Sequence, residues 1–332
     1  MSLNVGVIGT GMIGQEHIVR LNQTLPGAKV VAVSDVDQTL AAGVASRYGA
    51  RLIETGEELV SSADVDAVIV ASWGPTHEQY VLASIAAEKP VFCEKPLATT
   101  ADSCRRIIDA EVAFGRRLVQ VGFMRQYDVG YMAMKQTIES GSIGAPLLYH
   151  SVHRNPTVPS FYTADMLIND TAVHDIDISR WLLSDEVSAV TVLKARPNSR
   201  GGGADPLLII LEMLGGAIVN IEVSVNVGYG YDIRGEVSGE WGAAELAASN
   251  PIFVKTNGET RGRVPGNWPE RFTQAFNDEF RAWIAAASNG TAAGPSAWDG
   301  YAATVACQAA LQANATQTRT SVTMIERPGF YS

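Results

Sequence analysis

Short apolar runs alternate with amphipathic stretches over the first 121 residues. The apolar runs read NVGVIG, KVVAVSD, VDAVIVAS, PVFCEKP and RLVQVGF. Between them, the spacing of apolar positions predicts helices at residues 13–25, 40–48, 79–87 and 101–114. Buried-type strands that alternate with such helices are typical of a parallel sheet covered on both faces. The pattern therefore predicts an α/β domain over residues 1–121.

The pattern changes after residue 122, where strand-like segments follow one another with few helices between them. These segments read PLLYHSVHRN, AVTVLKA, LLIILEM, AIVNIEVSVNV, DIRGEVSG and GAAELAA. Such a run of strands favours an α+β domain with a large, mostly antiparallel sheet over residues 122–332. We expect residues 196–206 to form a loop between strands and helices at 271–287 and 296–313 to close the structure.

Composition and charge narrow the class of protein. A length of 332 residues favours two domains, and the net charge of −10 argues against a nucleic-acid partner, which usually requires a basic surface. No secretion signal is visible at the N-terminus, and no apolar run is long enough to span a bilayer. The three cysteines show no metal-type spacing, so we expect a reduced, cytoplasmic setting.

The first strand leads into a glycine-rich turn, VGVIGTGMIGQEH, that is typical of dinucleotide binding in a Rossmann fold. Three glycines at this spacing permit a tight turn, a close approach to a pyrophosphate and close packing of the next helix on the strand. The turn residues expected to bind cofactor are Gly9, Thr10, Gly11, Met12, Ile13 and Gly14. Asp35 ends the second strand and would accept hydrogen bonds from the ribose, which favours NAD over NADP. The alternative is an ordinary glycine turn.

The stretch NDTAVHDIDISRWLL places charged residues on an otherwise apolar helix. Asp170, His174 and Asp177 fall on one stripe, because residues three and four apart share a helix face. His174 is the candidate general base, since its proton is exchanged near neutral pH, and Asp170 could orient its ring. Asp175 and Asp177 are expected to serve structure through caps or ion pairs.

Two alternatives compete with this catalytic interpretation. Asp170 could be a helix N-cap and His174 a packed core histidine. A metal site is also conceivable, but the spacing is not that of a helical zinc motif, and hydride transfer to NAD does not require a metal. We therefore expect no metal.

Lys95 follows the strand PVFCEKP, at the sheet edge where nucleotide folds bind ligands. Its ammonium group could stabilise a developing alkoxide, an effect commonly worth ~2–4 kcal/mol of barrier. The alternative is an ordinary surface lysine.

Polar residues on the first strand of the second domain could line a pocket rich in hydrogen-bonding groups. Alternation along LLYHSVHRNP puts Tyr149, Ser151, His153 and Asn155 on one face. Each alone could be a polar residue on the surface of a sheet. Together with residues elsewhere in the chain they suit a polyol, and the substrate-binding candidates are Lys95, Met124, Arg125, His153, Asn155, Asp170, His174 and Tyr231.

The motif CEKPLA (residues 93–98) resembles that of the glucose–fructose oxidoreductase / inositol dehydrogenase family, and the resemblance runs over nearly the whole chain. The motifs HRNPTV, NDTAVHDID, NVGYGYDI and SAWDGY, in this order, are similar to those of bacterial inositol 2-dehydrogenases. The resemblance implies an open-faced C-terminal sheet, contact of Glu94 with the nicotinamide ribose, and a homotetramer. It extends the expected cofactor site to Ser72, Trp73, His77, Glu94 and Lys95. Trp73 departs from many relatives, which carry a smaller or polar residue there.

These observations together predict NAD-dependent oxidation of myo-inositol to 2-keto-myo-inositol (scyllo-inosose). His174 would act as general base, with Lys95 and Asp170 assisting. Alternatives are the same chemistry on scyllo-inositol or a pyranose, or a non-catalytic NAD-binding sugar sensor. Apolar residues on both faces of strands such as LLIILEM predict a homo-oligomer paired through the C-terminal sheet. His17 is expected to be a solvated or packing residue.

Overall fold

A computed structural model of the chain describes residues 2–196, 205–247 and 253–331. The chain divides into two compact units that each draw on distant parts of the sequence. The first unit, here called the nucleotide unit, contains Met1–Phe123, Phe276–Thr304 and Ile325–Ser332. The second, here called the sheet unit, contains Met124–Ala275 and Val305–Met324.

The nucleotide unit is built on a six-stranded sheet with the strand order β3-β2-β1-β4-β5-β6. Every pairing in it is parallel, which confirms the α/β prediction. The short strand β3 was not expected, since two residues carry no periodicity. The strands are β1 (Leu3–Ile8), β2 (Ala28–Ser34), β3 (Arg51–Leu52), β4 (Ala67–Val70), β5 (Val91–Glu94) and β6 (Val119–Gly122).

Helices connect these strands at the positions that the apolar spacing predicts, with one addition. The unpredicted helix α3 begins at a capping box, in which the Thr55 side chain accepts from the Glu58 backbone N–H and the Glu58 side chain accepts from Thr55. The helical elements are α1 (Met12–Val19), η1 (Arg20–Thr24), α2 (Gln38–Tyr48), α3 (Gly56–Ser61), η2 (Gly74–Thr76), α4 (His77–Ala86), α5 (Ala101–Phe114), η5 (Gly329–Tyr331) and parts of α8 (Trp268–Ala287) and α9 (Ala297–Thr316).

One face of this sheet is covered by residues from opposite ends of the sequence. Val5 and Val7 of β1 join a single apolar cluster with Phe280 and Trp283 of α8, all of them fully buried. On the other face of β1, a side chain at Gly6 would collide with Leu59 of α3. The core of the nucleotide unit therefore requires residues near 280 as well as the first 123.

The sheet unit contains a seven-stranded sheet in the order β12-β11-β7-β10-β9-β8-β15. Five of its six pairings are antiparallel and only β10 with β7 is parallel, so the mostly antiparallel prediction is confirmed. The strands are β7 (Pro146–Arg154), β8 (Val187–Lys194), β9 (Leu207–Met213), β10 (Ile218–Ser224), β11 (Asp232–Gly239), β12 (Ala243–Glu245) and β15 (Thr320–Ser321).

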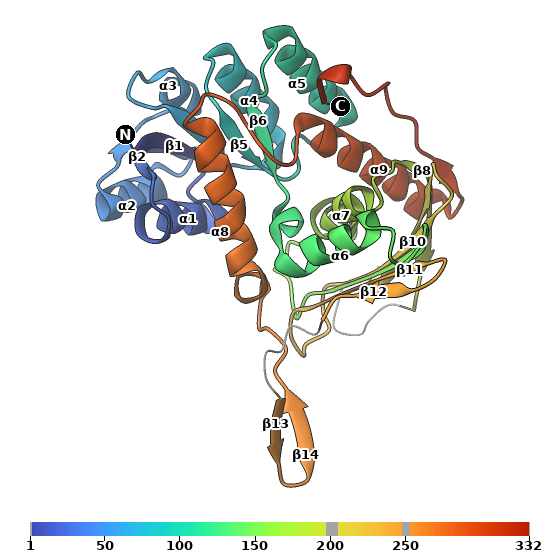
Figure 1. Ribbon diagram of the computed structural model, residues 1–332. Coiled ribbons are helices and arrows are strands. Elements are labelled where there is room, and N and C mark those ends of the chain that lie inside the picture. Colours follow the sequence, from blue (N-terminus) through green and yellow to red (C-terminus); the bar gives the residue numbers. More distant parts are fainter. Residues whose placement is uncertain (1, 197–204, 248–252, 332) are drawn as a thin grey trace. The chain divides into compact units, whose positions relative to one another are not determined.

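Helices α6 (Val129–Glu139) and α7 (Val173–Leu183) lie on one face of this large sheet (Figure 1). Short helical turns precede them, η3 (Met124–Tyr127) before α6 and η4 (Leu167–Ala172) before α7. Helix α6 was not predicted, although Asp128 caps it by accepting from the backbone N–H of Gly130 and Tyr131. The α7 side of the sheet thus receives the buried side chains that form the candidate site.

A separate two-stranded hairpin, β13 (Phe253–Thr256) and β14 (Glu259–Gly262), also belongs to the sheet unit and is exposed along its length. It was not predicted. Most of the loop expected at residues 196–206 lies outside the described residues. No helix in the described ranges is both long and apolar enough to cross a membrane.

Candidate active site

The glycine turn between β1 and α1 has the shape that the motif predicts. Gly9 has a φ of +96°, and a Cβ there would collide with the Ala71 backbone. A Cβ at Gly14 would collide with the carbonyl oxygen of Gly9. At Gly11, by contrast, a Cβ would meet nothing within 4 Å. Two glycines are thus required by the fold itself, while the third leaves open space at the start of α1, where backbone N–H groups can receive a phosphate.

Asp35 lies just past β2 and is held by the same turn. Its Oδ2 accepts hydrogen bonds from the Thr10 backbone N–H at 2.5 Å and from the Thr10 hydroxyl at 2.9 Å. Its Oδ1 accepts from the Asp37 backbone N–H at 3.0 Å. Thr10 is fully buried, whereas Asp35 is half-buried. The structure therefore fixes a carboxylate beside the glycine turn while leaving part of it accessible.

Glu94, at the end of β5, is a buried carboxylate held by a histidine from α1. His17 Nε2 lies 2.7 Å from Glu94 Oε1, and the Lys95 backbone N–H donates to Oε2 at 3.2 Å. Burial works against ionisation of Glu94, but the hydrogen bond from His17, together with the charge and backbone N–H of Lys95, outweighs it and lowers the Glu94 pKa. His17 is packed rather than solvated, and sequence reasoning did not assign it to the site. Lys95 itself is half-buried.

The turn after β4 contains the remaining cofactor candidates. His77 is buried between two carbonyl oxygens, that of Pro96 at 2.7 Å from Nδ1 and that of Ser72 at 3.0 Å from Nε2. Burial is the largest influence on the His77 pKa and lowers it, while the contacts with the Pro96 and Ser72 carbonyl groups act in the opposite direction. His77 thus ties the Ser72 turn to the Glu94–Pro96 turn. Trp73 is 77% exposed on the same turn.

Asp170 and His174 lie on consecutive helical turns, but not on one uniform helix. Asp170 belongs to η4, a π-helical segment, and His174 to the first turn of α7. The π turn is wider than an α-helical turn, but Asp170 and His174 are four residues apart and so remain about one turn from each other. Both residues are half-buried, whereas Asp177 is buried and accepts from the Gln126 side chain at 3.1 Å.

Tyr162 is a neighbour of Asp170 that the sequence did not indicate. Its hydroxyl donates to the carbonyl oxygen of Met166 at 2.7 Å. Burial, and then the Asp170 carboxylate, raise the pKa of Tyr162. The side chain therefore stays protonated beside Asp170.

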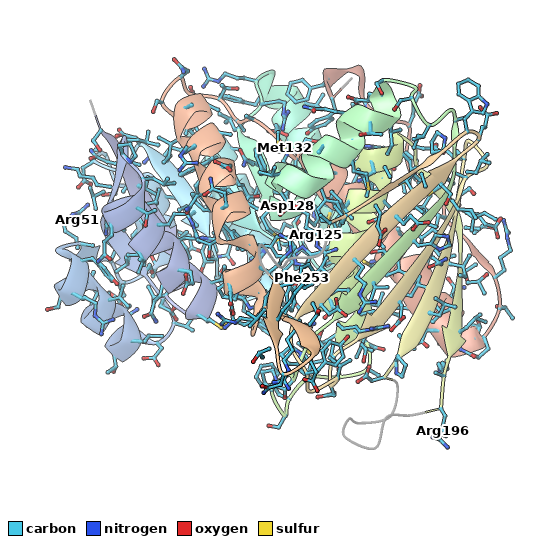
Figure 2. The ribbon with its side chains drawn as sticks, turned by 60° about the horizontal axis from the view of Figure 1, so that its bottom comes forward. Arg51, Arg125, Asp128, Met132, Arg196 and Phe253 are labelled. Carbon is cyan, nitrogen blue, oxygen red and sulfur yellow. The ribbon has the colours of Figure 1, made fainter. Side chains whose placement is uncertain are left out.

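A buried carboxylate, Asp175, organises the polar residues that face α7 from the large sheet. Its Oδ1 accepts from Arg125 at 2.6 Å and from the Ser151 hydroxyl at 2.8 Å, and its Oδ2 lies 2.7 Å from His153 Nδ1. Desolvation would raise the Asp175 pKa, but the charges of Arg125 and His153 overcome it and hold the pKa well below its usual range. The expectation that Asp175 forms ion pairs is confirmed. Figure 2 labels Arg125, which is 1% exposed.

His153 is oriented by this carboxylate. Its Nδ1 lies 2.7 Å from Oδ2 of the ionised Asp175 and 2.9 Å from the guanidinium of Arg125, so a carboxylate and a guanidinium both contact this nitrogen. The other ring nitrogen, Nε2, lies 3.2 Å from the hydroxyl of Tyr231. Burial raises the pKa of Tyr231 to about 12. The structure thus brings together three of the predicted substrate residues: Arg125, His153 and Tyr231.

For two other substrate candidates, Met124 and Asn155, the structure gives burial and backbone contacts but no side-chain hydrogen bond among those described. Met124 is buried at the start of η3. Asn155 is half-buried immediately after β7, and its backbone N–H donates to the carbonyl oxygen of Ser224 at 2.8 Å. Neither side chain is assigned a role by these contacts.

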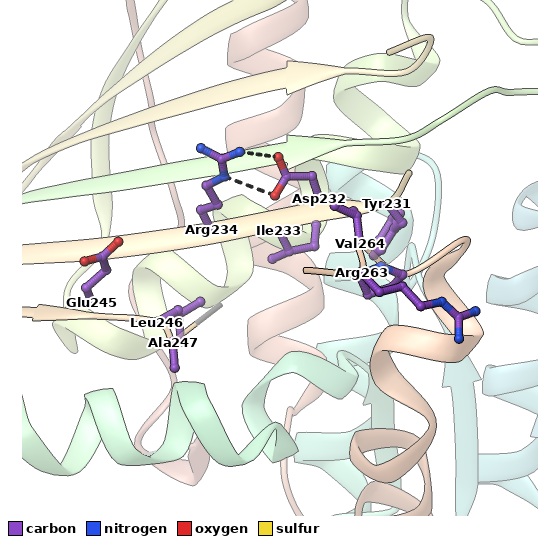
Figure 3. Close-up of a pocket in the computed structure, with 10 residues that line it drawn as sticks. Tyr231, Asp232, Ile233, Arg234, Glu245, Leu246, Ala247, Arg263 and Val264 are labelled. Atoms are coloured by element: carbon purple, nitrogen blue, oxygen red, sulfur yellow. Dashed lines mark hydrogen bonds and ion pairs between the residues drawn. The ribbon is translucent and has the colours of Figure 1, made fainter. Parts of the chain in front are cut away.

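A cavity of about 320 Å³ opens in the sheet unit beside β11 (Figure 3). Within it, Arg234 donates two hydrogen bonds to Asp232, at 2.7 and 3.1 Å. Of the residues predicted to bind substrate, the lining includes Tyr231. Its full lining is Tyr231, Asp232, Ile233, Arg234, Glu245, Leu246, Ala247, Arg263, Val264 and Pro265.

The described part of the chain contains no group of three or more His, Cys, Asp or Glu residues arranged to hold a metal ion. The absence of a metal from the reaction stays a prediction.

Two family models together match almost the whole chain. Residues 3–123 match the NAD-binding Rossmann-fold model of an oxidoreductase family, and residues 135–324 match the C-terminal alpha/beta domain model of the same family. The first model ends at residue 123, where the nucleotide unit passes into the sheet unit, and the second begins at residue 135.

Individual relatives cover the full length. The chain is 49% identical to inositol 2-dehydrogenase 3 of Saccharopolyspora erythraea, covering all of this chain and 98% of the relative. It is 37% identical to myo-inositol dehydrogenase from Lactobacillus casei, solved in complex with NAD(H) and myo-inositol, with a TM-score of 0.97 and full coverage of both chains. Scyllo-inositol dehydrogenase from the same organism shares the fold, at 24% identity, a TM-score of 0.89 and coverage of 97% and 99%.

Proposed function

The chain belongs to the Gfo/Idh/MocA family of NAD-binding oxidoreductases, and from this premise we propose that it oxidises myo-inositol to 2-keto-myo-inositol (scyllo-inosose). The observation that carries the proposal is the full-length similarity to an enzyme whose structure holds NAD(H) and myo-inositol. The residues that such a reaction needs are present in this chain, in two groups that belong to the two units.

The nucleotide unit fits NAD. The open position at Gly11 admits a pyrophosphate to the N-terminus of α1, and the collisions at Gly9 and Gly14 show why the flanking positions cannot carry side chains. Thr10 holds Asp35 so that its carboxylate can receive ribose hydroxyls, and its charge disfavours a 2′-phosphate. Ser72, Trp73, His77, Glu94 and Lys95 complete the proposed cofactor site.

Proton removal is assigned to His174, with Asp170 and Lys95 assisting. Bound NAD supplies an electron-poor ring that accepts the hydride from the carbon bearing the hydroxyl. His174 takes the proton of that hydroxyl, so the carbon is left as a carbonyl. Asp170 orients His174 and the substrate, and the Lys95 ammonium stabilises the negative charge that develops on oxygen.

Recognition of the polyol is assigned to the group organised by Asp175. Arg125 donates to Asp175, Tyr231 can donate or accept, and Nε2 of His153 lies 3.2 Å from the Tyr231 hydroxyl. Met124 and Asn155 complete the proposed lining. A site with several oriented polar groups discriminates against compounds that lack matching hydroxyls, because its own groups would then be left unpaired.

The absorbance of NADH after mixing the protein with NAD and each of myo-inositol, scyllo-inositol and glucose tests this function. We expect the highest kcat/KM with myo-inositol, and a lower value when NADP replaces NAD. A higher value with scyllo-inositol or glucose would reassign the substrate. No turnover of any polyol, with NAD still bound, would support the alternative of a sugar sensor.

The outer face of the large sheet supports assembly into a homo-oligomer, for which we propose a tetramer. Leu148 and Ile218 are paired across β7 and β10 and remain 38% and 44% exposed, and Leu193 on β8 is 51% exposed. An apolar surface of this kind is typical of an interface. Sedimentation of wild-type protein and of Ile218→Glu tests the proposal, and equal masses would contradict it.

The three free, buried cysteines support a reducing, cytoplasmic location.

A further inference from the structure

His17 is a fully buried histidine that the proposed reaction does not use. It lies on α1, three residues after Gly14, and its ring packs 4.5 Å from the ring of Phe280 and 5.6 Å from that of Phe92. Both of its nitrogens are engaged, Nε2 by Glu94 at 2.7 Å and Nδ1 by Arg20 at 2.8 Å. An imidazole in such apolar surroundings with two charged partners has a defined protonation state.

The two partners determine which nitrogen carries the proton. A guanidinium can only donate, so Nδ1 of His17 must accept from Arg20 through its lone pair. A carboxylate can only accept, so Nε2 must carry hydrogen and donate to Glu94. Burial lowers the His17 pKa, which agrees with a neutral ring. Hydrogen bonds therefore run in one direction, from Arg20 through His17 to Glu94.

Arg20 is itself held in place. Its Nε donates to the Asn277 side chain at 3.0 Å, and its guanidinium lies 5.0 Å from the ring of Phe276. The negative charges of Glu279, Glu16 and Glu94 act on it. The donor that sets the His17 tautomer is consequently anchored by α8.

At the other end, Glu94 connects this chain of hydrogen bonds to the proposed cofactor site. With Oε1 committed to His17, Oε2 accepts from the Lys95 backbone and lies against Gly122, where an added Cβ would be 3.1 Å away. The carboxylate is fixed in orientation at the sheet edge, one residue before Lys95.

We infer that His17 is a positioning residue for cofactor binding: held as its Nε2–H tautomer by Arg20, it orients the Glu94 carboxylate toward the bound nucleotide. The inference deepens the proposed function, because it rests on NAD binding at this edge of the sheet. It does not depend on which polyol is oxidised.

Two substitutions of His17 separate positioning from packing. His17→Gln retains one donor and one acceptor, whereas His17→Leu fills the apolar space without either. We expect His17→Leu to weaken NAD binding about tenfold, the loss typical of removing one hydrogen bond to a charged group, and His17→Gln to recover most of it. Calorimetric titration with NAD in the absence of polyol measures this effect independently of activity.

Tyr331→Phe provides a matched control. The Tyr331 hydroxyl donates to buried Glu111 at 2.6 Å, and Glu111 in turn accepts from the backbone at the start of β6, away from its Gly122 end. This variant also removes one hydrogen bond to a buried glutamate of the nucleotide unit. We expect it to lower the free energy of unfolding while NAD affinity stays within about twofold. An equal loss of affinity in Tyr331→Phe and His17→Leu would overturn the inference.

A double-mutant cycle tests the route through Glu94. If His17 acts by orienting Glu94, the effect of His17→Leu on NAD affinity should largely disappear in a Glu94→Gln background. Losses that multiply instead would show that His17 acts elsewhere and would overturn the inference.

The tautomer can be measured without any substitution that threatens folding. The chain has five histidines, so ¹⁵N spectra of histidine-labelled wild-type protein are tractable, with His17→Gln as the assignment reference. We expect a neutral His17 ring protonated at Nε2 throughout the neutral pH range. A ring protonated at Nδ1, or one that gains charge near pH 6.5, would overturn the inference. Absence of polyol oxidation, with these results intact, would count against the proposed function alone.

Discussion

Each unit contains a buried histidine whose ring nitrogen lies 2.7 Å from a carboxylate oxygen. The two pairs differ in which of their groups is proposed to face a ligand. In the nucleotide unit, His17 donates to Glu94, and the carboxylate is the group that stands next to a proposed ligand. In the sheet unit, Nδ1 of His153 faces Asp175, and the carboxylate is wholly enclosed by protein.

The position of the arginine explains the difference. Arg20 contacts the far nitrogen of His17, so the imidazole lies between arginine and carboxylate. Arg125 instead contacts the carboxylate of Asp175 at 2.6 Å and, at 2.9 Å, the same nitrogen of His153 that faces this carboxylate. In the first arrangement, His17 orients the carboxylate of Glu94. In the second, the carboxylate of Asp175 orients the guanidinium of Arg125 and the imidazole of His153. The role of a histidine–carboxylate pair is therefore indicated by its third partner.

The largest expected effect comes from removing the enclosed carboxylate. We expect Asp175→Asn to lower the free energy of unfolding by about 3–5 kcal/mol at neutral pH, because Arg125 would be left as an uncompensated buried charge. The folded-state pKa of Asp175 is lowered from 3.8, so its contribution is present above that pH and is lost as the pH falls toward the folded value. Urea unfolding at several pH values measures this difference.

The exposed ion pair between Glu212 and Arg319, also in the sheet unit, serves as the control for Asp175. Glu212→Gln should change stability little, since both partners are solvated. If Asp175→Asn were equally mild, Asp175 would not organise the group as described.

A third histidine tests whether either pair carries the proton transfer. We expect His174→Ala to lower kcat by about a hundredfold to a thousandfold while NAD affinity stays nearly unchanged, because a general base acts in the chemical step. Steady-state kinetics and NAD titration measure the two quantities. Equal losses in both would remove His174 from the role of base and reopen the question of which histidine acts.

Asp35, like Glu94, is a carboxylate of the nucleotide unit that protein donors hold beside the proposed cofactor site. We expect Asp35→Ser to shift the ratio of kcat/KM values for NAD and NADP by about tenfold toward NADP, because the charge that repels a 2′-phosphate is removed. Asp37→Ser is the control, since Asp37 caps α2. An unchanged cofactor ratio in Asp35→Ser would refute the ribose assignment.

The smallest expected effect is the contribution of His17 to the pH dependence of stability. The His17 pKa is lowered from 6.5 in the folded state, so only the unfolded chain gains this proton as the pH falls below 6.5. Stability should fall there with a slope of at most about 1.4 kcal/mol per pH unit from this residue. We expect the slope to be smaller in His17→Gln. Identical slopes in urea unfolding would mean that His17 gains its proton in the folded state as well.

Much of the fold is encoded in local patterns. The five longer strands of the parallel sheet are short buried runs, and the helices between them have regular apolar spacing, so both could be predicted. Helix α6 was missed although its amphipathic pattern is no weaker than that of the predicted helices α2 and α4 and Asp128 marks its start; Gly130 in its first turn lowers the helix propensity there. The parallel pairing of β10 with β7 leaves no trace in the spacing of either strand.

The residues of the candidate site also differ in whether a local sequence pattern reveals them. The glycine turn and Asp35 could be found because the motif is contiguous or nearly so. His17 and Glu94 are 77 residues apart, and only the contact itself reveals the pair. The π-helical turn at Asp170 also has no periodic signature, so the angular relation of Asp170 to His174 could not be derived from sequence alone.

The shared apolar cluster of β1 and α8 has a consequence for synthesis. A ribosome releases the strands of the parallel sheet long before it has made Phe280 and Trp283, which complete their core. Until then the apolar side chains that pack on α8 have no cover, so we expect the nascent N-terminal segment to remain incompletely folded. For the same reason, we expect residues 1–123 produced alone not to fold into an independent NAD-binding domain.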